Sequence, residues 1–334
     1  MMDAMSLVRA LRDPMSACQL DAQGWTGLIA VARAEQMIGT LAHRLKGIPM
    51  PDAAARILAD ARLSAEHWRR AALWEAEAAR RALEPLGCPV ILLKGTAFVA
   101  AGLDAGRGRA IGDLDILVPR DRLDEVEHAL LETGWEWVKP DAYDDAYYRR
   151  WMHELPPLIH RERDRMIDVH HTILPPTARI TPDVGALIAD SVPLGSGLRA
   201  LSPPDMICHA VIHLFADGDL SGGLRNLWDI DRLLREYRDD ASVWEALPHR
   251  ATRHGITREF ERAMRLAERL FGSPMPIAPK SHALDAFYAR RLTARDGWGR
   301  ETRKALRFAF YVRSHWRRMP PLMLARHLWI KSRR

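Results

Sequence analysis

Two aspartates on one short apolar segment are the residues of this chain with the clearest chemistry. Asp113 and Asp115 alternate with Leu114 and Ile116 in the run AspLeuAspIleLeuVal at 113–118. Because side chains alternate between the two faces of a strand, both carboxylates project to the same side. Neighbouring carboxylates repel each other and resist burial, so the pair is typical of a site that holds divalent metal against phosphate. The ordinary alternative is an exposed AspXaaAsp at the start of a strand.

A third carboxylate follows in a second strand-like run, at 165–171. There Ile167 and Val169 alternate with Asp168 and His170, as in a half-buried strand. If the two strands are neighbours, Asp168 joins the first two aspartates. Three carboxylates can hold two magnesium ions about 4 Å apart, one activating a nucleophile and the other neutralising a leaving pyrophosphate. By the same alternation His170 shares the face of Asp168, where it either holds that carboxylate or contacts phosphate or acceptor.

The segment before the aspartates carries groups that suit phosphate. An apolar strand at 89–93 runs into Lys94 and Gly95, and a helix is expected from Thr96 to Leu103. Gly95 allows a close turn, Thr96 can cap the helix, and the helix amides with the Lys94 charge form a phosphate cradle. Arg109, just ahead of the aspartates, is placed to steady a triphosphate. The ordinary reading is that Gly95 ends a strand and both cations are solvated.

These segments together resemble the uncharacterised nucleotidyltransferases of the DNA polymerase beta-like superfamily. The shared features are a LeuLeuLysGly turn at 92–95, an ArgXaaXaaXaaAspXaaAsp strand at 109–115 and a later AspXaaHis strand at 168–170. The superfamily usually has GlyGly or GlySer at the turn, where this chain has Gly95 and Thr96, so Lys94 is a feature of the narrower family.

The resemblance covers about residues 88–235. It implies transfer of a nucleoside monophosphate from an NTP, such as ATP, to an acceptor, with two Mg²⁺ ions held by Asp113, Asp115 and Asp168. Phosphate would be bound by Lys94, Gly95, Thr96 and Arg109. It does not name the acceptor.

A helix expected from Ser202 carries His209 and His213, one turn apart on the same face. A zinc site here lacks both the glutamate of a zinc-protease helix and an evident third ligand. The family resemblance instead places His213, with Arg225 and Asp229 on the next helix, at an acceptor pocket that His170 could also reach. A buried, hydrogen-bonded histidine without a catalytic role is equally compatible with the pattern.

The chain has the composition of a globular protein, with 334 residues of which 48% are hydrophobic and 28% charged. Residues 1–86 show helical spacing, 87–200 alternate strands with helices, and 201–289 return to helical spacing. This spacing predicts an α+β protein with a helical N-terminal segment and a helical C-terminal domain, and the resemblance implies that the part between them is a small mixed-sheet nucleotidyltransferase core. A strand at 155–160, interrupted by Pro156, is expected at the edge of the sheet.

The net charge of +6 is unevenly distributed. From Arg290 onward there are fourteen Lys and Arg against two acids, a net charge of +12 that leaves −6 for the preceding residues. Aromatic residues interleave with these arginines, which suits RNA phosphates, an anionic membrane surface or an acidic protein. The alternative is an amphipathic helix that packs its aromatics on the core. Either way, residues 290–334 are expected to form a basic helical tail.

The cysteine spacing favours a reducing compartment, and the hydropathy pattern argues against a membrane span. Cys18, Cys88 and Cys208 are widely separated and lack CysXaaXaaCys spacing, and no run of about 18 apolar residues occurs. Asp3 and Arg9 do not fit a secretory signal. A cytoplasmic protein without a transmembrane segment, free or peripheral at a membrane, is expected.

The sequence does not identify the acceptor, because a small molecule, a peptide, a protein side chain and an RNA end are all compatible with the same three acids. A competing hypothesis is a non-catalytic nucleotide-, RNA- or peptide-binding module of the same fold. The three acids argue against it, since a binding module has no need of all of them.

Overall fold

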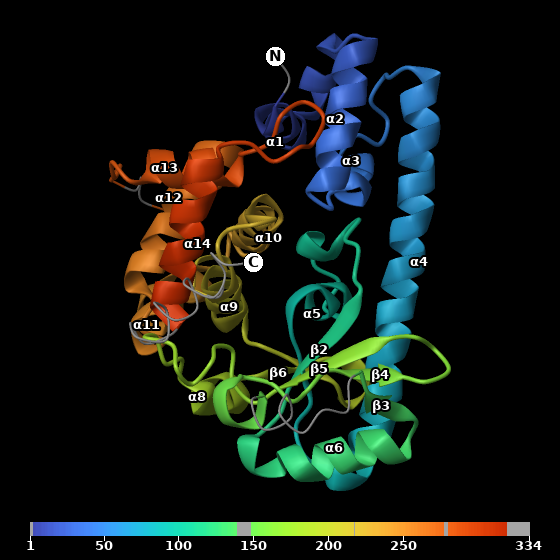
Figure 1. Cartoon of the computed structure of the whole chain (residues 1–334), viewed down its shortest axis with the longest axis vertical. Coiled ribbons are helices and arrows are strands. Elements are labelled where there is room, and N and C mark those ends of the chain that lie inside the picture. The colour runs from blue at the N-terminus through green and yellow to red at the C-terminus, as the bar shows by residue number, and fades with distance from the viewer. Residues whose placement is uncertain (1–2, 139–147, 217, 277–279, 319–334) are drawn as a thin grey trace, which may run out of the picture.

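A seven-stranded mixed sheet and a larger number of helices make up the computed structural model, which describes residues 3–138, 148–216, 218–276 and 280–318 (Figure 1). The strand order is β3-β4-β5-β2-β1-β7-β6. The α+β class expected from the sequence is confirmed. The strands are β1 (Ile91–Leu92), β2 (Asp113–Leu117), β3 (Trp135–Trp137), β4 (Leu158–His160), β5 (Met166–His170), β6 (Val192–Pro193) and β7 (Arg199–Ala200).

The N-terminal helices are tied to the sheet by one long helix. They are α1 (Ala4–Arg12), α2 (Ala22–Ala34), α3 (Ile38–Arg44) and α4 (Asp52–Leu83). The 32-residue α4 begins after Pro51 and buries mainly alanines, which let neighbouring elements approach closely. It packs against α3 at one end and against α6 (Leu123–Glu132) and β2 further along (Figure 1). One rigid element therefore joins the N-terminal helices to the strands that carry the aspartates.

The centre of the sheet is built from the two acidic strands. Strands β2 and β5 run parallel, with Asp115 opposite Asp168, while β1 pairs antiparallel with β2. The alternate residues Leu114, Ile116 and Ile167 are buried in the core. The apolar face of each strand is thus anchored in the core, and the acidic residues are carried on the opposite face.

The edge position expected for the strand at 155–160 is wrong. The strand that forms, β4, lies inside the sheet between β3 and β5. It starts at Leu158, after Pro156 and Pro157, so neither proline removes a hydrogen bond from the ladder. Proline is indeed excluded from the interior strand, which is shorter than the apolar run because it starts after both prolines.

The C-terminal half is helical, as expected. Its helices are α9 (Pro203–Phe215), α10 (Gly223–Glu236), α11 (Ala241–Arg253), α12 (Thr257–Phe271), α13 (Asp285–Leu292) and α14 (Lys304–Arg318). They pack back onto the start of the chain, because α1 contacts α12 and Arg295 forms an ion pair with Glu35. None of the helices described here combines the length and the apolar character needed to cross a membrane.

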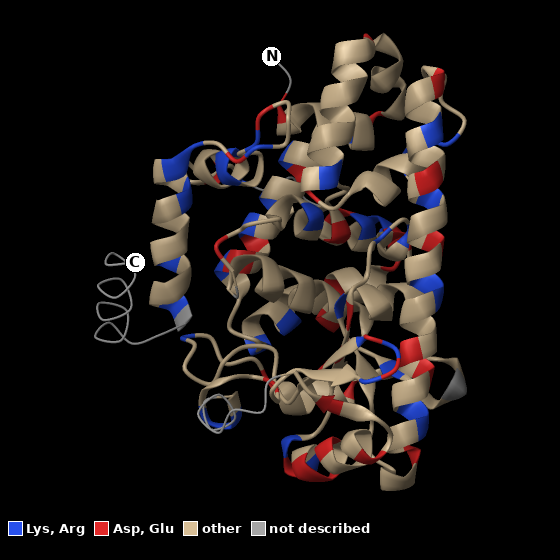
Figure 2. Cartoon of the chain, turned by 45° about the vertical axis from the view of Figure 1, so that its right-hand side comes forward, with Lys and Arg blue, Asp and Glu red and all other residues tan. Residues whose placement is uncertain are grey.

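The expected basic tail is described only as far as Arg318, and residues 319–334 lie outside the described part. Basic residues recur along α14 (Figure 2). Phe310 is buried, whereas Phe308 and Trp316 are exposed, and Arg317 pairs with Glu259 at 2.7 Å. Helix α14 therefore packs one part of its aromatic set on the C-terminal helices and presents another part to solvent.

Candidate active site

Asp113, Asp115 and Asp168 converge at the centre of the sheet. One carboxylate oxygen of each lies within 4.8 Å of the others. The parallel pairing of β2 and β5, which sets Asp115 opposite Asp168, brings the three together. Asp115 is buried, Asp168 is half-buried and Asp113 is exposed. Solvent and ligands can therefore reach the cluster at Asp113 but not at Asp115.

Asp115 is held by two cationic or donor groups. Lys94 Nζ lies 2.5 Å from Asp115 Oδ1, and His170 Nε2 lies 3.0 Å from the same oxygen. Burial opposes ionisation of this carboxyl, but Lys94 and His170 outweigh burial and hold the pKa of Asp115 below its usual value. An ionised Asp115 accepts hydrogen bonds from both groups. His170 is therefore brought to the aspartates, as the strand alternation predicted.

The pKa of Asp168 is shifted in the opposite direction to that of Asp115. Burial raises the pKa of its carboxyl to about 7, helped by the negative charges of Asp115 and Glu154. Facing carboxylates with one poorly compensated member form a donor set that a divalent cation would stabilise. Three carboxylate oxygens are also the ligand type that Mg²⁺ takes.

Lys94 reaches Asp115 from an unusual backbone conformation. Its φ is +49°, in the left-handed region that non-glycine residues seldom adopt. The helix α5 (Lys94–Ala100) starts at this residue, with Leu93 as its N-cap. Thr96 is buried inside the helix, so the expectation that it caps the helix is wrong. The extended Leu93 takes the cap position because the helix begins two residues earlier than the apolar pattern indicated.

Gly95 makes room for Arg109. A Cβ atom added at Gly95 would lie 2.4 Å from Arg109 Nε, closer than real Cβ contacts allow. The Arg109 guanidinium donates to Asp229 and stacks over the Phe98 ring at 5.7 Å. The absence of a side chain at Gly95 therefore leaves room for Arg109, which lines a small cavity together with Lys94.

The residues expected at an acceptor pocket also lie beside Arg109. Arg225 and Asp229 are both buried, with 3.5 Å between Arg225 Nε and Asp229 Oδ1. Arg225 also donates to the Thr40 hydroxyl, which ties α10 to α3. In this arrangement Arg225 and Asp229 hold Arg109 and the N-terminal helices in place.

His209 and His213 lie on the same side of Lys94. Together with Lys94, Arg109 and Asp229 they line a cavity of about 20 Å³, which is room for about one water molecule. Burial lowers the pKa of His209 well below its usual value, so this imidazole is neutral. Two groups of potential metal ligands occur among the described residues, and neither contains His209 or His213. The zinc idea for this helix gains no support.

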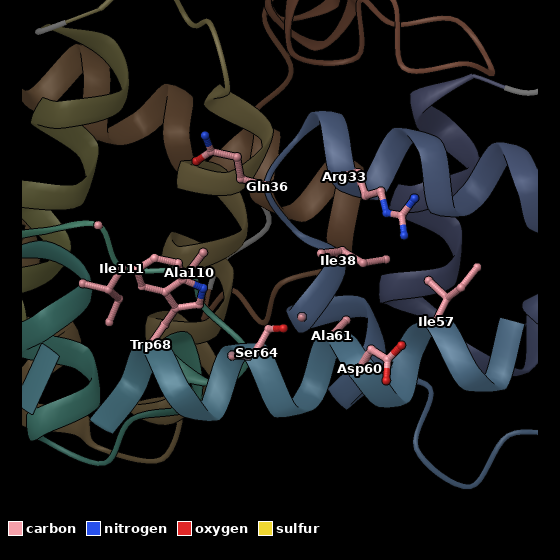
Figure 3. Close-up of a pocket in the computed structure, with 14 residues that line it drawn as sticks. Arg33, Gln36, Ile38, Ile57, Asp60, Ala61, Ser64, Trp68, Ala110 and Ile111 are labelled. Atoms are coloured by element: carbon pink, nitrogen blue, oxygen red, sulfur yellow. The ribbon is translucent and has the colours of Figure 1, made fainter. Parts of the chain in front are cut away.

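A much larger cavity, of about 560 Å³, lies between α4, the α2–α3 turn and the loop that leads into β2 (Figure 3). Helix α4 contributes Asp60, Ser64 and Trp68, which are spaced one turn apart, and the loop contributes Ile111 and Gly112. Gly112 immediately precedes Asp113. No motif in the sequence predicted this cavity, although the four-residue spacing of Asp60, Ser64 and Trp68 on α4 is a signal that points to a common helix face.

The loop that closes this cavity is held by a backbone contact between two glycines. A Cβ atom at Gly39 on α3 would lie 2.4 Å from the Gly108 carbonyl oxygen, and Gly108 itself has a φ of +70°. Only residues without side chains allow this approach. The N-terminal helices therefore fix the loop that leads into Asp113 at the start of β2.

Comparison with known proteins identifies the family. Neither a curated protein nor a solved structure matches the chain. A family model described as an uncharacterised nucleotidyltransferase matches residues 21–272, a range that contains α2 to α12 and all three aspartates. The chain therefore belongs to this uncharacterised nucleotidyltransferase family.

Proposed function

We propose that the chain transfers a nucleoside monophosphate from an NTP to an acceptor hydroxyl, with Asp113, Asp115 and Asp168 as ligands of divalent metal. The observation that carries this proposal is the convergence of three carboxylate oxygens within 4.8 Å on adjacent strands of a family member. Mg²⁺, bound as two ions, would neutralise phosphate charge and activate the attacking oxygen.

The chain's own residues divide the remaining tasks. Asp113 is the exposed carboxylate, open to the incoming triphosphate, and Asp168 is the one proposed to accept the proton of the acceptor hydroxyl. Lys94 and Arg109 are proposed to balance phosphate charge. Support for Lys94 comes from its position among the acids, since the charges of all three aspartates raise the pKa of its ammonium against the opposing effect of burial.

We propose that the acceptor enters through the cavity along α4. Its volume of about 560 Å³ suits a small molecule or one side chain of a larger acceptor. Trp68 and Ile111 supply apolar surface, and Asp60 and Ser64 supply polar groups. The loop in its wall continues into Asp113, so the end of the cavity at Ile111 and Gly112 is the end proposed to lead to the aspartates.

The test of nucleotidyl transfer uses NTPs labelled at the α-phosphate, Mg²⁺ and fractions of a cell lysate as the source of acceptor. Wild-type protein is expected to label an acceptor, and Asp113→Asn is expected to reduce labelling by a factor of about a thousand or more, because a metal ligand is lost. The matched control, Asp121→Asn, changes an exposed aspartate just beyond β2 and is expected to keep the wild-type rate.

Binding measurements separate the enzyme from a non-catalytic module. Saturating NTP with Mg²⁺ is expected to stabilise the protein by about 2–3 kcal/mol in thermal unfolding. A protein that gains this stability but labels no acceptor would be a binding module. An Asp113→Asn protein that transfers label as fast as the wild type would refute the metal site.

The acceptor cavity has its own test. Trp68→Ala is expected to raise the KM for the labelled acceptor about fivefold to tenfold, because an aromatic contact is lost, with the KM for NTP unchanged. Trp74→Ala is the control, since Trp74 is an exposed tryptophan of the same helix and, like Trp68, carries a stacked arginine. Equal KM values for both variants would place the acceptor elsewhere.

A further inference from the structure

A second cluster of side chains that can bind metal adjoins the aspartates through His170, which contacts Asp115. It consists of His153, Glu154 and His170, whose ligand atoms lie within 4.8 Å of one another. Glu154 Oε2 is 3.5 Å from His170 Nδ1 and 3.7 Å from His153 Nε2. Ligand atoms of a tetrahedral zinc ion, bound at about 2.0–2.1 Å, are separated by roughly 3.4 Å. The two shorter separations are therefore close to those of a metal site.

The backbone holds the cluster together across a wide sequence separation. Leu155 N–H donates to the Val169 carbonyl at 2.9 Å, and His171 N–H donates to the His153 carbonyl at 3.0 Å. Glu154 and His170 form an antiparallel bridge between these two bonds. The segment 153–155 is thus paired along β5, and its side chains meet His170 without any rearrangement of the chain.

The hydrogen bonding of His170 prepares one nitrogen for a ligand. Its Nε2 lies 3.0 Å from Asp115 Oδ1, and in the neutral tautomer that donates to this oxygen Nδ1 is the nitrogen left to bind a metal ion. His170 is 2% exposed, and Nδ1 is buried without a hydrogen-bond partner among the described residues. A metal-bound histidine usually donates its other N–H to a carboxylate, which fixes the tautomer and the orientation of the ring. Asp115 is such a carboxylate, because it can accept the Nε2–H of His170.

We propose that His153, Glu154 and His170 bind a transition-metal cation of the Zn²⁺ type, at a site separate from the three aspartates. Two imidazoles and one carboxylate suit Zn²⁺ and similar ions, whereas Mg²⁺ takes oxygen ligands. Three protein ligands leave a coordination position for water or another ligand. The cation would hold the His170 ring in the orientation that donates to Asp115 and so position a ligand of the aspartate site.

The test measures cation binding in the whole chain, independently of activity. Chelator-treated protein in an Asp113→Asn and Asp168→Asn background, which removes the aspartate site, is titrated with Co²⁺ and then with Zn²⁺. We expect one Co²⁺ per chain, visible absorption bands of a four-coordinate ion, and displacement by Zn²⁺. The background variant keeps His153, Glu154, His170 and Asp115.

Ligand variants assign the site. His153→Ala is expected to weaken Zn²⁺ binding by a factor of about 100 and Glu154→Gln by at least about tenfold. The matched control is His128→Ala, because His128 and Glu132 form another histidine–carboxylate pair, at 3.2 Å, on the exposed face of α6. This control is expected to bind Zn²⁺ as the background variant does.

Several outcomes would overturn the proposal. Absence of stoichiometric Co²⁺ binding in the background variant, or equal affinities in Glu154→Gln and the control, would show an ordinary buried histidine–glutamate pair. Wild-type protein that binds Zn²⁺ while the background variant does not would assign the ion to the aspartates. If His153→Ala fails to fold, the nearly isosteric Glu154→Gln decides the question, with its melting temperature measured in chelator.

Discussion

Asp231 on α10 and Asp168 on β5 are both buried or partly buried carboxylates, but their surroundings differ. Asp231 is fully buried and accepts hydrogen bonds from Arg232, from Arg235 at 3.0 Å and from Ser273 at 2.6 Å. Asp168 faces Asp115 and Glu154, and within the described residues no cation lies at ion-pair distance from it. Asp231 is compensated by its own neighbours, whereas burial and the nearby negative charges of Asp115 and Glu154 raise the pKa of Asp168.

The largest expected effect removes the compensated carboxylate. Asp231→Ala leaves two arginines without their buried partner and should lower the free energy of unfolding by about 3–5 kcal/mol. Urea denaturation at neutral pH measures this. Asp239→Ala is the control, because Asp239 pairs with Arg238 at 2.9 Å on an exposed surface and should cost at most about 1 kcal/mol. Similar losses for both variants would show that burial does not distinguish the two pairs.

At Asp168 we expect ionisation of the carboxylate to lower the free energy of unfolding. This is measured in the presence of a chelator, so that no metal contributes. Its folded pKa of about 7 is above the unfolded value of about 3.9, so the folded state binds this proton more tightly. Wild-type stability from this group is therefore present at low pH and lost as the pH rises from about 4 to about 7. Discounted for partial exposure, the loss is about 1–3 kcal/mol.

Asp168→Asn has no such group, so its free energy of unfolding relative to the wild type should rise across the same pH interval. Chemical denaturation at several pH values checks this. If the two proteins show the same pH dependence, the pKa of Asp168 is not raised in the folded protein. Asp168 would then not differ from Asp231 in the way described above.

A smaller effect concerns the compensated arginine beside the site. Gly95→Ala pushes against Arg109 and should cost about 1–2 kcal/mol of stability, because the side chain bonded to Asp229 has to move. Gly112→Ala is matched to it, since a Cβ atom there has no neighbour within 4 Å and should change stability by no more than about 0.5 kcal/mol. Equal stabilities would show that Arg109 adapts without cost.

Much of the aspartate cluster could be predicted from the sequence. The strand period of two places Asp113 with Asp115 and Asp168 with His170, and the structure keeps both pairings on β2 and β5. Short-range rules failed where a boundary depended on distant contacts. The cap assigned to Thr96 and the edge position of β4 were wrong because helix and strand starts shift by two or three residues when the surrounding chain decides them.

The sequence by itself determined the α+β class and the residues that carry the acidic chemistry, because side-chain alternation is a local property of the backbone. Tertiary structure alone decided that Asp115 is paired with Lys94 while Asp168 is not, and that His153 and Glu154 meet His170. It also decided that α4 and the α2–α3 turn enclose a cavity beside Asp113. These outcomes depend on strand order and helix packing, which are set by the burial of apolar faces far apart in the sequence.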